Sequence, residues 1–282
     1  MSKWARVQAR LQTQAALLPQ RAAAALRLGA WPDFVIIGGQ RCGTTSLYDY
    51  LTQHREIVPA ARKEIHYFDN HYDRGAAWYR AFFYRAAVRR VFGPCLTGEA
   101  TPYYLFHPHA AARLAANVPA ARLIVMLRNP IDRAYSHYLH EVRLGQETLP
   151  FAAAAAREAE RVQTTVDALQ PPGAHDLAHQ HFTYLSRGLY AAQLRTWQRY
   201  FAREQMLIII SESFFTQPGQ ALAKCLAFLG VQDTNWQPLH FEKRNYHGPY
   251  EGIPLPLRRW LEAYFAAPNQ ALVDWLGYDP GW

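Results

Sequence analysis

One stretch of the chain, FVIIGGQRCGTTSLYDYL at residues 34–51, constrains the fold more than any other. Its apolar start predicts a buried strand over 34–37, and the following glycines predict a tight turn into a helix over 45–53. Backbone amides at the start of such a helix bind a phosphate, because they lack partners within the helix and lie at the positive end of its dipole. Gly38 and Gly43 have the spacing of a nucleoside-triphosphate loop, but Thr44 stands where that loop has its lysine. The stretch therefore predicts either a phosphate site that does not grip a γ-phosphate or an ordinary strand-to-helix turn.

The rest of the chain alternates apolar runs with helical patterns. Further strands are predicted over 123–127 and 207–210, with a short one over 95–99. Helices are predicted over 76–84, 108–117, 131–144, 151–166, 184–201, 218–229 and 256–276, the last broken at Pro268. Strands that alternate with long helices predict an α/β fold with a P-loop-like central parallel sheet and helices on both faces. Ligands of such sheets bind at the carboxyl ends of the strands.

Charge and composition narrow the choice of partners. The 282 residues suffice for one α/β domain, and the net charge of +8 favours anionic ligands such as nucleotides, lipids or sulfated substrates. Three widely spaced cysteines have no zinc pattern and predict free thiols in a reducing, cytoplasmic compartment. In the loop predicted over 170–181, no carboxylate or cysteine joins the three histidines in a convincing set of metal ligands, so no metal is expected.

The first 31 residues form a separate unit. Their basic residues stand among alanines and leucines, without an acidic residue before Asp33. This pattern predicts a basic amphipathic helical extension. It either lies on an anionic membrane or a partner, or packs loosely on the domain.

A second segment with anion-binding chemistry is RLIVMLRNPIDRAYSHYLHEV at residues 122–142. A buried strand ends at Arg128, Pro130 starts a helix, and Ser136 follows on its first turns. A cation and a hydroxyl are thereby expected at the same sheet edge as the glycine turn. The alternative is that Arg128 pairs with a nearby carboxylate such as Asp132.

Together, the two segments resemble those of the PAPS-dependent sulfotransferases, which transfer a sulfuryl group from 3′-phosphoadenosine 5′-phosphosulfate (PAPS). GGQRCGTTSL is similar to their 5′-phosphosulfate loop, and LRNPIDRAYSHY to their 3′-phosphate segment. The stretches KEIHYFD, GEATPYYLF, SRGLYAAQLRTW, FEKRNYHGPY and WLGYDPGW resemble the heparan-sulfate (glucosaminyl) branch and its bacterial relatives. The resemblance runs in order from about residue 33 to 282, and it implies one sulfotransferase domain over 32–282, PAPS as donor, no metal and no nucleic-acid partner.

The resemblance also implies roles for single residues. The implied PAPS-binding residues are Arg41, Cys42, Gly43, Thr44, Thr45, Ser46, Arg128, Ser136, Lys243, Arg244 and Tyr246. Arg41 stands where many relatives have a lysine, and it is expected to stabilise the leaving group. Glu64 is the implied general base, with a pKa that burial would raise toward working pH, and His66 is the next candidate.

The acceptor, a small molecule, lipid or saccharide with a hydroxyl or amine, is expected to contact His66, Asp69, Glu99, Thr101 and Tyr104. Ala100 replaces a lysine of the glucosaminyl enzymes, which argues against heparan sulfate itself as the acceptor.

Two other functions compete with this interpretation. A P-loop-like small-metabolite kinase is disfavoured because no lysine follows Gly43 and no strand ends in a clear magnesium-binding carboxylate. A basic nucleic-acid-binding module is disfavoured because the arginines are scattered rather than clustered on one face.

Overall fold

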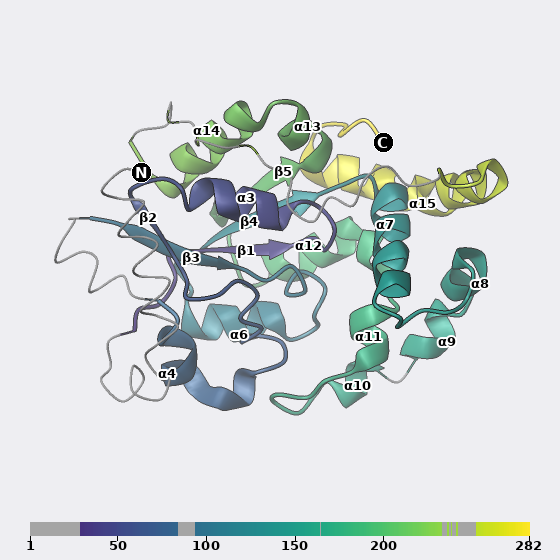
Figure 1. The fold of residues 1–282 in the computed structure, drawn as a ribbon, viewed down its shortest axis with the longest axis horizontal. Coiled ribbons are helices and arrows are strands. Elements are labelled where there is room, and N and C mark those ends of the chain that lie inside the picture. Colours follow the sequence, from purple (N-terminus) through teal and green to yellow (C-terminus); the bar gives the residue numbers. More distant parts are fainter. Residues whose placement is uncertain are drawn as a thin grey trace.

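The chain folds around a parallel five-stranded sheet with the order β2-β3-β1-β4-β5 (Figure 1). The computed structural model describes residues 29–83, 94–163, 165–232 and 252–282, together with positions 236, 238 and 241. The strands are β1 (Phe34–Gly38), β2 (Ile57–Pro59), β3 (Leu96–Ala100), β4 (Arg122–Leu127) and β5 (Met206–Ile210). The strands expected near 34, 95, 123 and 207 are confirmed. The three residues of β2 were missed because so short a run has no readable periodicity.

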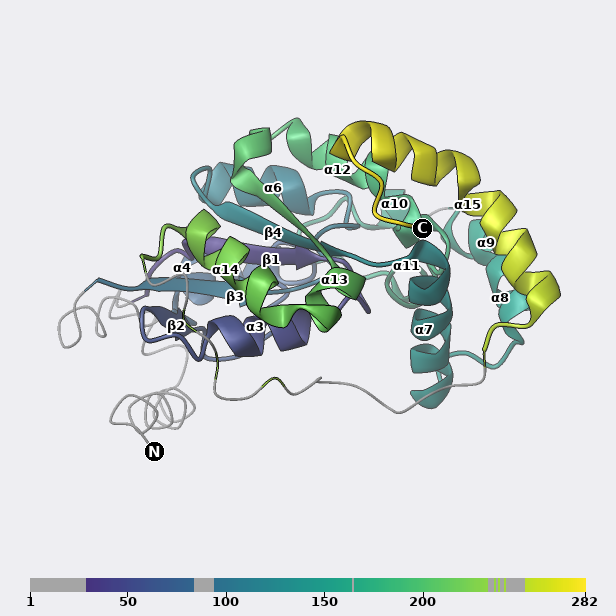
Figure 2. The same ribbon diagram turned by 90° about the horizontal axis from the view of Figure 1, so that it is seen from above.

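Helices cover both faces of this sheet, as the sequence predicts (Figures 1 and 2). Their bounds are α3 (Thr44–Leu51), α4 (Gly75–Arg80), α6 (Ala110–Asn117), α7 (Pro130–Arg143), α8 (Phe151–Ala156), α9 (Glu158–Val162), α10 (Thr165–Ala168), α11 (Leu177–His181), α12 (Tyr190–Gln198), α13 (Ser211–Thr216), α14 (Pro218–Leu229) and α15 (Leu255–Leu276).

Successive residues of β1 point to opposite faces and so enter different cores. Phe34 and Ile36 pack in a cluster with residues of α3 and α14. Val35 and Ile37 pack in a second cluster with residues of α4, α6 and α12. Both faces of the strand are buried, which explains why its sequence is a continuous apolar run.

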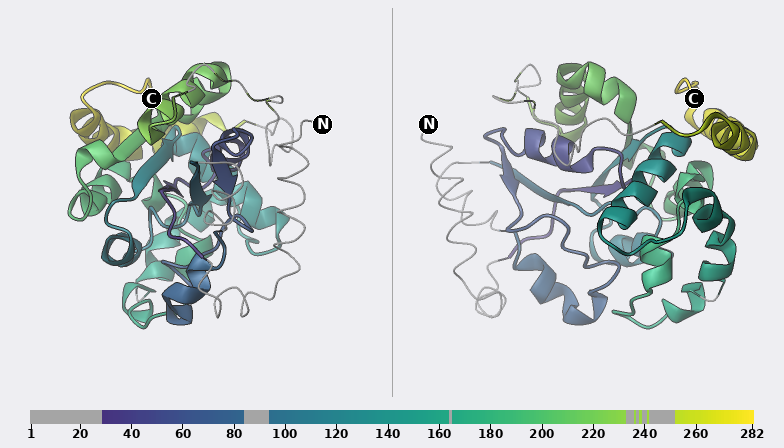
Figure 3. Two further views of the ribbon diagram at one scale, coloured as in Figure 1. Left: turned by 90° about the vertical axis from the view of Figure 1, so that its left-hand side faces the viewer. Right: turned by 45° about the vertical axis from the view of Figure 1, so that its right-hand side comes forward.

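A third apolar cluster lies beyond the carboxyl ends of the strands, where α7, α8 and the start of α15 pack together. Figure 3 shows α7 to α11 gathered at this end of the molecule. Here the sequence prediction was partly wrong. The single helix expected over 151–166 is a series of short helices, and the one expected over 184–201 contains only α12 as α-helix. The loop expected over 170–181 ends in α11, where the Asp176 side chain caps the helix by accepting from the His179 amide at 2.8 Å.

The last helix, α15, also differs from expectation because it continues through Pro268. Phe265 and Leu272 are buried on either side of that proline, so packing holds both halves in line.

Residues 29–31 belong to the packed domain. The Ala30 amide donates to the Phe83 carbonyl at 3.2 Å, and the Trp31 ring lies 5.8 Å from that of Tyr79. Packing therefore begins before residue 32, whereas the rest of the predicted amino-terminal extension lies outside the described residues. Among the described helices, none is long and apolar enough to cross a membrane.

Candidate active site

The phosphate loop, residues 38–43, connects β1 to α3 at the carboxyl edge of the sheet. Gly43 precedes α3 with φ 93°, and a side chain there would lie 2.8 Å from Phe215. Glycine is therefore required both by backbone conformation and by space. Thr44 and Thr45 line a pocket of about 760 Å³, together with Arg41 and Gly43. Cys42 and Ser46 are buried and do not line this pocket, and burial raises the pKa of the Cys42 thiol to about 11, so their side chains are not presented to a ligand.

The second anion segment, residues 128–136, reaches the same pocket because β4 is the parallel neighbour of β1. Asn129 caps α7 by accepting from the Ile131 amide at 3.0 Å, and Pro130 occupies the first turn. This geometry starts the helix directly after Arg128 and brings Ser136 to the pocket.

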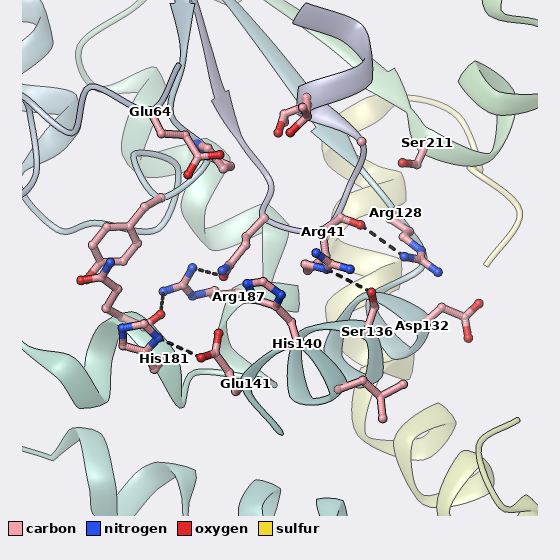
Figure 4. A pocket seen from close by; sticks show the side chains of 18 of the residues that line it. Arg41, Glu64, Arg128, Asp132, Ser136, His140, Glu141, His181, Arg187 and Ser211 are labelled. Carbon is pink, nitrogen blue, oxygen red and sulfur yellow. Dashed lines mark hydrogen bonds and ion pairs between the residues drawn. The ribbon is translucent and has the colours of Figure 1, made fainter. Parts of the chain in front are cut away.

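Direct contacts join the two segments (Figure 4). Arg41 Nε donates to Ser136 Oγ at 3.2 Å, and Arg128 donates to the Arg41 carbonyl oxygen at 3.2 Å. Asp132 pairs with Arg258 at 2.8 Å, and no ion pair between described residues includes Arg128, so the structure contradicts the alternative pairing of Arg128 with Asp132. Burial and the nearby charges of Arg143 and Arg128 lower the pKa of Arg41. Cations that repel one another within one pocket favour an anionic ligand.

The Glu64 loop, residues 63–69, forms the opposite side of the pocket. Glu64 and His66 line it, and His66 Nδ1 lies 2.7 Å from the buried Asp69 carboxylate. Among the described residues, only Arg41, Glu64 and His66 combine a side chain with a positive φ, at 67°, 55° and 57°. Such conformations are unfavourable for residues other than glycine, and they persist where surrounding structure holds them, often at functional sites. The three residues predicted to be catalytic therefore share an unusual backbone conformation, with a positive φ.

The expectation that burial would raise the pKa of Glu64 toward working pH was wrong. Burial alone raises its pKa, but His66 and the salt-bridged Lys63 outweigh that effect and hold the pKa at about 2. For His66 the directions are reversed: burial lowers its pKa, but the carboxylates of Asp69 and Glu64 outweigh burial and raise the pKa to about 10. Near neutral pH, Glu64 is a carboxylate beside an imidazolium, because neighbouring cations stabilise its charge more than burial opposes it.

The pocket has a further wall that the sequence did not predict. Glu141 on α7 is buried and accepts from His181 at 2.9 Å, while His137 lies 3.2 Å away on its other side. Arg187 donates to the Gln40 side chain of the phosphate loop at 2.5 Å. In Figure 4, Arg187, Glu141 and His181 lie on the Glu64 side of Arg41, away from Ser136. The sequence held signals for all three: Arg187 falls within the SRGLYAAQLRTW stretch, Glu141 within the segment 122–142, and His181 at the end of the loop predicted over 170–181.

Four predicted acceptor contacts are placed differently from expectation. Asp69, Glu99, Thr101 and Tyr104 are fully buried and do not line the pocket. The Thr101 and Tyr104 hydroxyls donate to the Glu99 carboxylate, so these groups form a network beneath the Glu64 loop rather than a surface for the acceptor.

Other predictions fall outside these observations. Lys243, Arg244 and Tyr246 lie outside the described residues. In the described part of the chain, no group of three or more histidine, cysteine, aspartate or glutamate side chains could hold a metal ion. The expected absence of a metal stays a prediction.

Fold and pocket together define an α/β protein in which a glycine-containing strand-to-helix loop and a second strand-to-helix segment meet in one cationic pocket. A family model described as a sulfotransferase domain matches residues 31–246. The crystal structure of a sulfotransferase from Alicyclobacillus acidocaldarius has a TM-score of 0.71 and 33% identity, covering 89% of this chain and 97% of that one.

Two curated relatives are also sulfotransferases. The chain is 26% identical over 319 residues to the membrane-associated sulfotransferase kil1 of Dictyostelium discoideum, covering 89% of this chain and 66% of that protein. It is 31% identical over 225 residues to heparan sulfate glucosamine 3-O-sulfotransferase 3B1 of Homo sapiens, covering 79% of this chain and 51% of that protein. The chain thus spans about half to two thirds of the length of these relatives. It belongs to the sulfotransferase domain family and to the PAPS-dependent class of sulfotransferases.

Proposed function

We propose that the pocket binds PAPS and transfers its sulfuryl group to a hydroxyl or amine of an acceptor, leaving adenosine 3′,5′-bisphosphate. One observation carries this proposal: Arg41 of the phosphate loop contacts both Ser136 and Arg128 of the second anion segment. A nucleotide with a phosphate at the 5′ and the 3′ position fits two joined anion sites. ATP lacks the 3′-phosphate, and the lysine that would contact its γ-phosphate is replaced by Thr44.

The residues at the donor end fit such a ligand. Amides from Gly43 to Ser46 and the side chains of Thr44 and Thr45 would bind the 5′-phosphate at the start of α3. Arg128 and Ser136 would bind the 3′-phosphate. The donor supplies a sulfuryl group that is already activated on its 5′-phosphate. Arg41 lies between the two phosphate sites and would stabilise the negative charge that develops on the leaving phosphate.

Glu64 is the proposed general base. Its low pKa keeps it ionised and ready to accept a proton throughout the physiological pH range. A carboxylate of such low basicity is a poor base toward a free hydroxyl. An attacking hydroxyl or amine becomes strongly acidic as its bond to sulfur forms, however, so proton transfer to Glu64 is favourable late in the reaction. His66, held by Asp69, orients this carboxylate and contacts the acceptor.

The acceptor remains a class rather than a compound: a small molecule, lipid or saccharide. The heparan-sulfate specificity in the name of the human relative does not transfer simply, because Ala100 stands where the glucosaminyl enzymes have a lysine. Transfer is proposed to need no metal, because cationic side chains surround the donor end. A cytoplasmic location and a membrane or partner contact through residues 1–31 stay proposals.

Thermal unfolding tests the donor site without a known acceptor. Adenosine 3′,5′-bisphosphate should raise the melting temperature in a concentration-dependent manner in the presence of EDTA. Adenosine 5′-phosphate should raise it only at much higher concentration. Added ATP should not displace adenosine 3′,5′-bisphosphate and so should not reduce the stabilisation. Equal stabilisation by adenosine 5′-phosphate would show that the second anion segment binds no phosphate.

A further inference from the structure

A buried carboxylate lies beneath the Glu64 loop without touching the pocket. Glu99, at the end of β3, is fully buried and accepts hydrogen bonds from three hydroxyls. Its donors are Tyr79 at 2.6 Å, Thr101 at 2.6 Å and Tyr104 at 3.0 Å. Burial raises the pKa of Glu99, and these hydrogen bonds oppose that rise. Burying a carboxyl group costs free energy, so we expect Glu99 to have a function in this position that an apolar side chain could not perform.

The hydrogen bonds of Tyr104 have a defined direction. Its hydroxyl oxygen accepts from the backbone amides of Tyr67 at 2.8 Å and Phe68 at 3.3 Å. Amides only donate, so the single hydroxyl hydrogen of Tyr104 is left for Glu99. Glu99 therefore fixes the orientation in which Tyr104 can accept from the loop.

The two amides held by Tyr104 belong to the segment that links His66 to Asp69. Arg113 on α6 holds the other side of this segment by donating to the carbonyls of Phe68 at 3.1 Å and Asp69 at 2.9 Å. Residues with positive φ stay in that conformation only when neighbouring structure holds them. The Glu64 loop has two such residues, and Tyr104 and Arg113 supply buried contacts to its backbone.

We propose that Glu99 is a positioning residue for sulfuryl transfer, acting through Tyr104 to hold the backbone that presents Glu64 and His66 to the acceptor. This inference rests on the proposed function of those two side chains. Tyr104 thus acts from below the loop, and its effect on the reaction is indirect.

Tyr104→Phe tests the connection, because it removes the hydroxyl and keeps the ring. Tyr79→Phe is the matched control: it also removes a hydroxyl donor from Glu99, but the Tyr79 hydroxyl makes no hydrogen bond to the Glu64 loop among the described contacts. Each full-length variant is assayed in three ways. These are the dissociation constant of adenosine 3′,5′-bisphosphate, the NMR titration of the His66 imidazole, and sulfuryl transfer to an acceptor found by screening pooled hydroxyl and amine compounds with labelled PAPS.

In Tyr104→Phe the His66–Asp69 pair should loosen, and the titration midpoint of His66 should fall by about one pH unit or more. Transfer should fall about 10- to 100-fold, the effect of a small misplacement of reacting groups. Nucleotide affinity should change by less than about twofold in both variants, since neither hydroxyl lines the pocket. Tyr79→Phe should also stay within about twofold of the native protein in transfer, because the Tyr79 hydroxyl makes no described hydrogen bond to the Glu64 loop.

Glu99→Gln provides a second route, because it keeps the size of the side chain but replaces one acceptor oxygen by an amide group that only donates, so that Tyr79, Thr101 and Tyr104 can no longer all donate to it. The His66 midpoint and the rate of transfer should both fall, as in Tyr104→Phe. The inference is overturned if both variants keep the native His66 midpoint, or if Tyr79→Phe loses as much transfer as Tyr104→Phe. Failure of the proposed function would look different: the His66 midpoint would still move in Tyr104→Phe, whereas Glu64→Gln would keep full transfer.

Discussion

Replacement of Arg128 by alanine is the sharpest test of the donor site. Arg128 follows β4 and donates to the Arg41 carbonyl at 3.2 Å, and among the described residues no carboxylate forms an ion pair with it. Its charge is therefore available for the 3′-phosphate. The substitution removes two things at once: the cation that faces that phosphate, and one hydrogen bond that supports the phosphate loop.

The two losses differ in magnitude, and they affect different nucleotides. Loss of one partner from a desolvated charge pair costs about 2–5 kcal/mol of binding free energy. Each 1.4 kcal/mol is tenfold in the dissociation constant, so adenosine 3′,5′-bisphosphate should bind about 30-fold to several thousandfold more weakly. Loss of the loop hydrogen bond costs about 0.5–1.5 kcal/mol, and adenosine 5′-phosphate, which lacks the 3′-phosphate, should suffer only this smaller loss.

Titration calorimetry of both nucleotides on both proteins separates these effects. Arg143→Ala is the matched control, because Arg143 lines the same pocket but is exposed and bonded to His140 rather than to the phosphate loop. Removal of an exposed charge should cost no more than about 1 kcal/mol. The assignment of the 3′-phosphate site is refuted if Arg128→Ala weakens both nucleotides equally, or if it leaves the dissociation constant of adenosine 3′,5′-bisphosphate unchanged.

Three further outcomes are expected. Glu64→Gln should reduce sulfuryl transfer by about 10²-fold or more while nucleotide affinity is retained, since glutamine cannot take the acceptor's proton; equal turnover would remove Glu64 as the base. Burial lowers the pKa of His107 to about 2 and that of His179, also repelled by Arg187, to about 3. The unfolded chain therefore binds protons below pH 6.5 that the folded protein does not, and the free energy of unfolding should fall with decreasing pH. In denaturant titrations between about pH 6 and 5, His107→Gln should flatten this dependence by up to about 1.4 kcal/mol per pH unit, and an unchanged slope would contradict a neutral buried His107. Deletion of residues 1–28 should leave nucleotide affinity intact, because the described pocket is lined by residues from Gln40 onward. If the shortened protein binds anionic vesicles as well as the full chain, those residues are not a membrane contact.

The fold was predictable where local pattern and burial coincide. The apolar runs that became β1, β4 and β5 are buried strands of a parallel sheet, which is the arrangement that such runs indicate. The prediction failed where packing between distant segments overrides local preference. Pro268 predicts a break, yet burial of Phe265 and Leu272 keeps α15 continuous.

The sequence by itself determined the local chemistry of the two proposed anion-binding segments, because each is a contiguous strand–turn–helix stretch whose backbone and side chains are set locally. Only the tertiary structure decided which groups meet. It brought Arg41 into hydrogen-bonding contact with Ser136, 95 positions away in the chain, and it paired Asp132 with Arg258 instead of Arg128. It also placed Glu99 and Tyr104 beneath the Glu64 loop, and it set the low pKa of Glu64. These properties depend on distances between charges and hydroxyls from different elements, and such distances exist only once the sheet has brought its strand ends together.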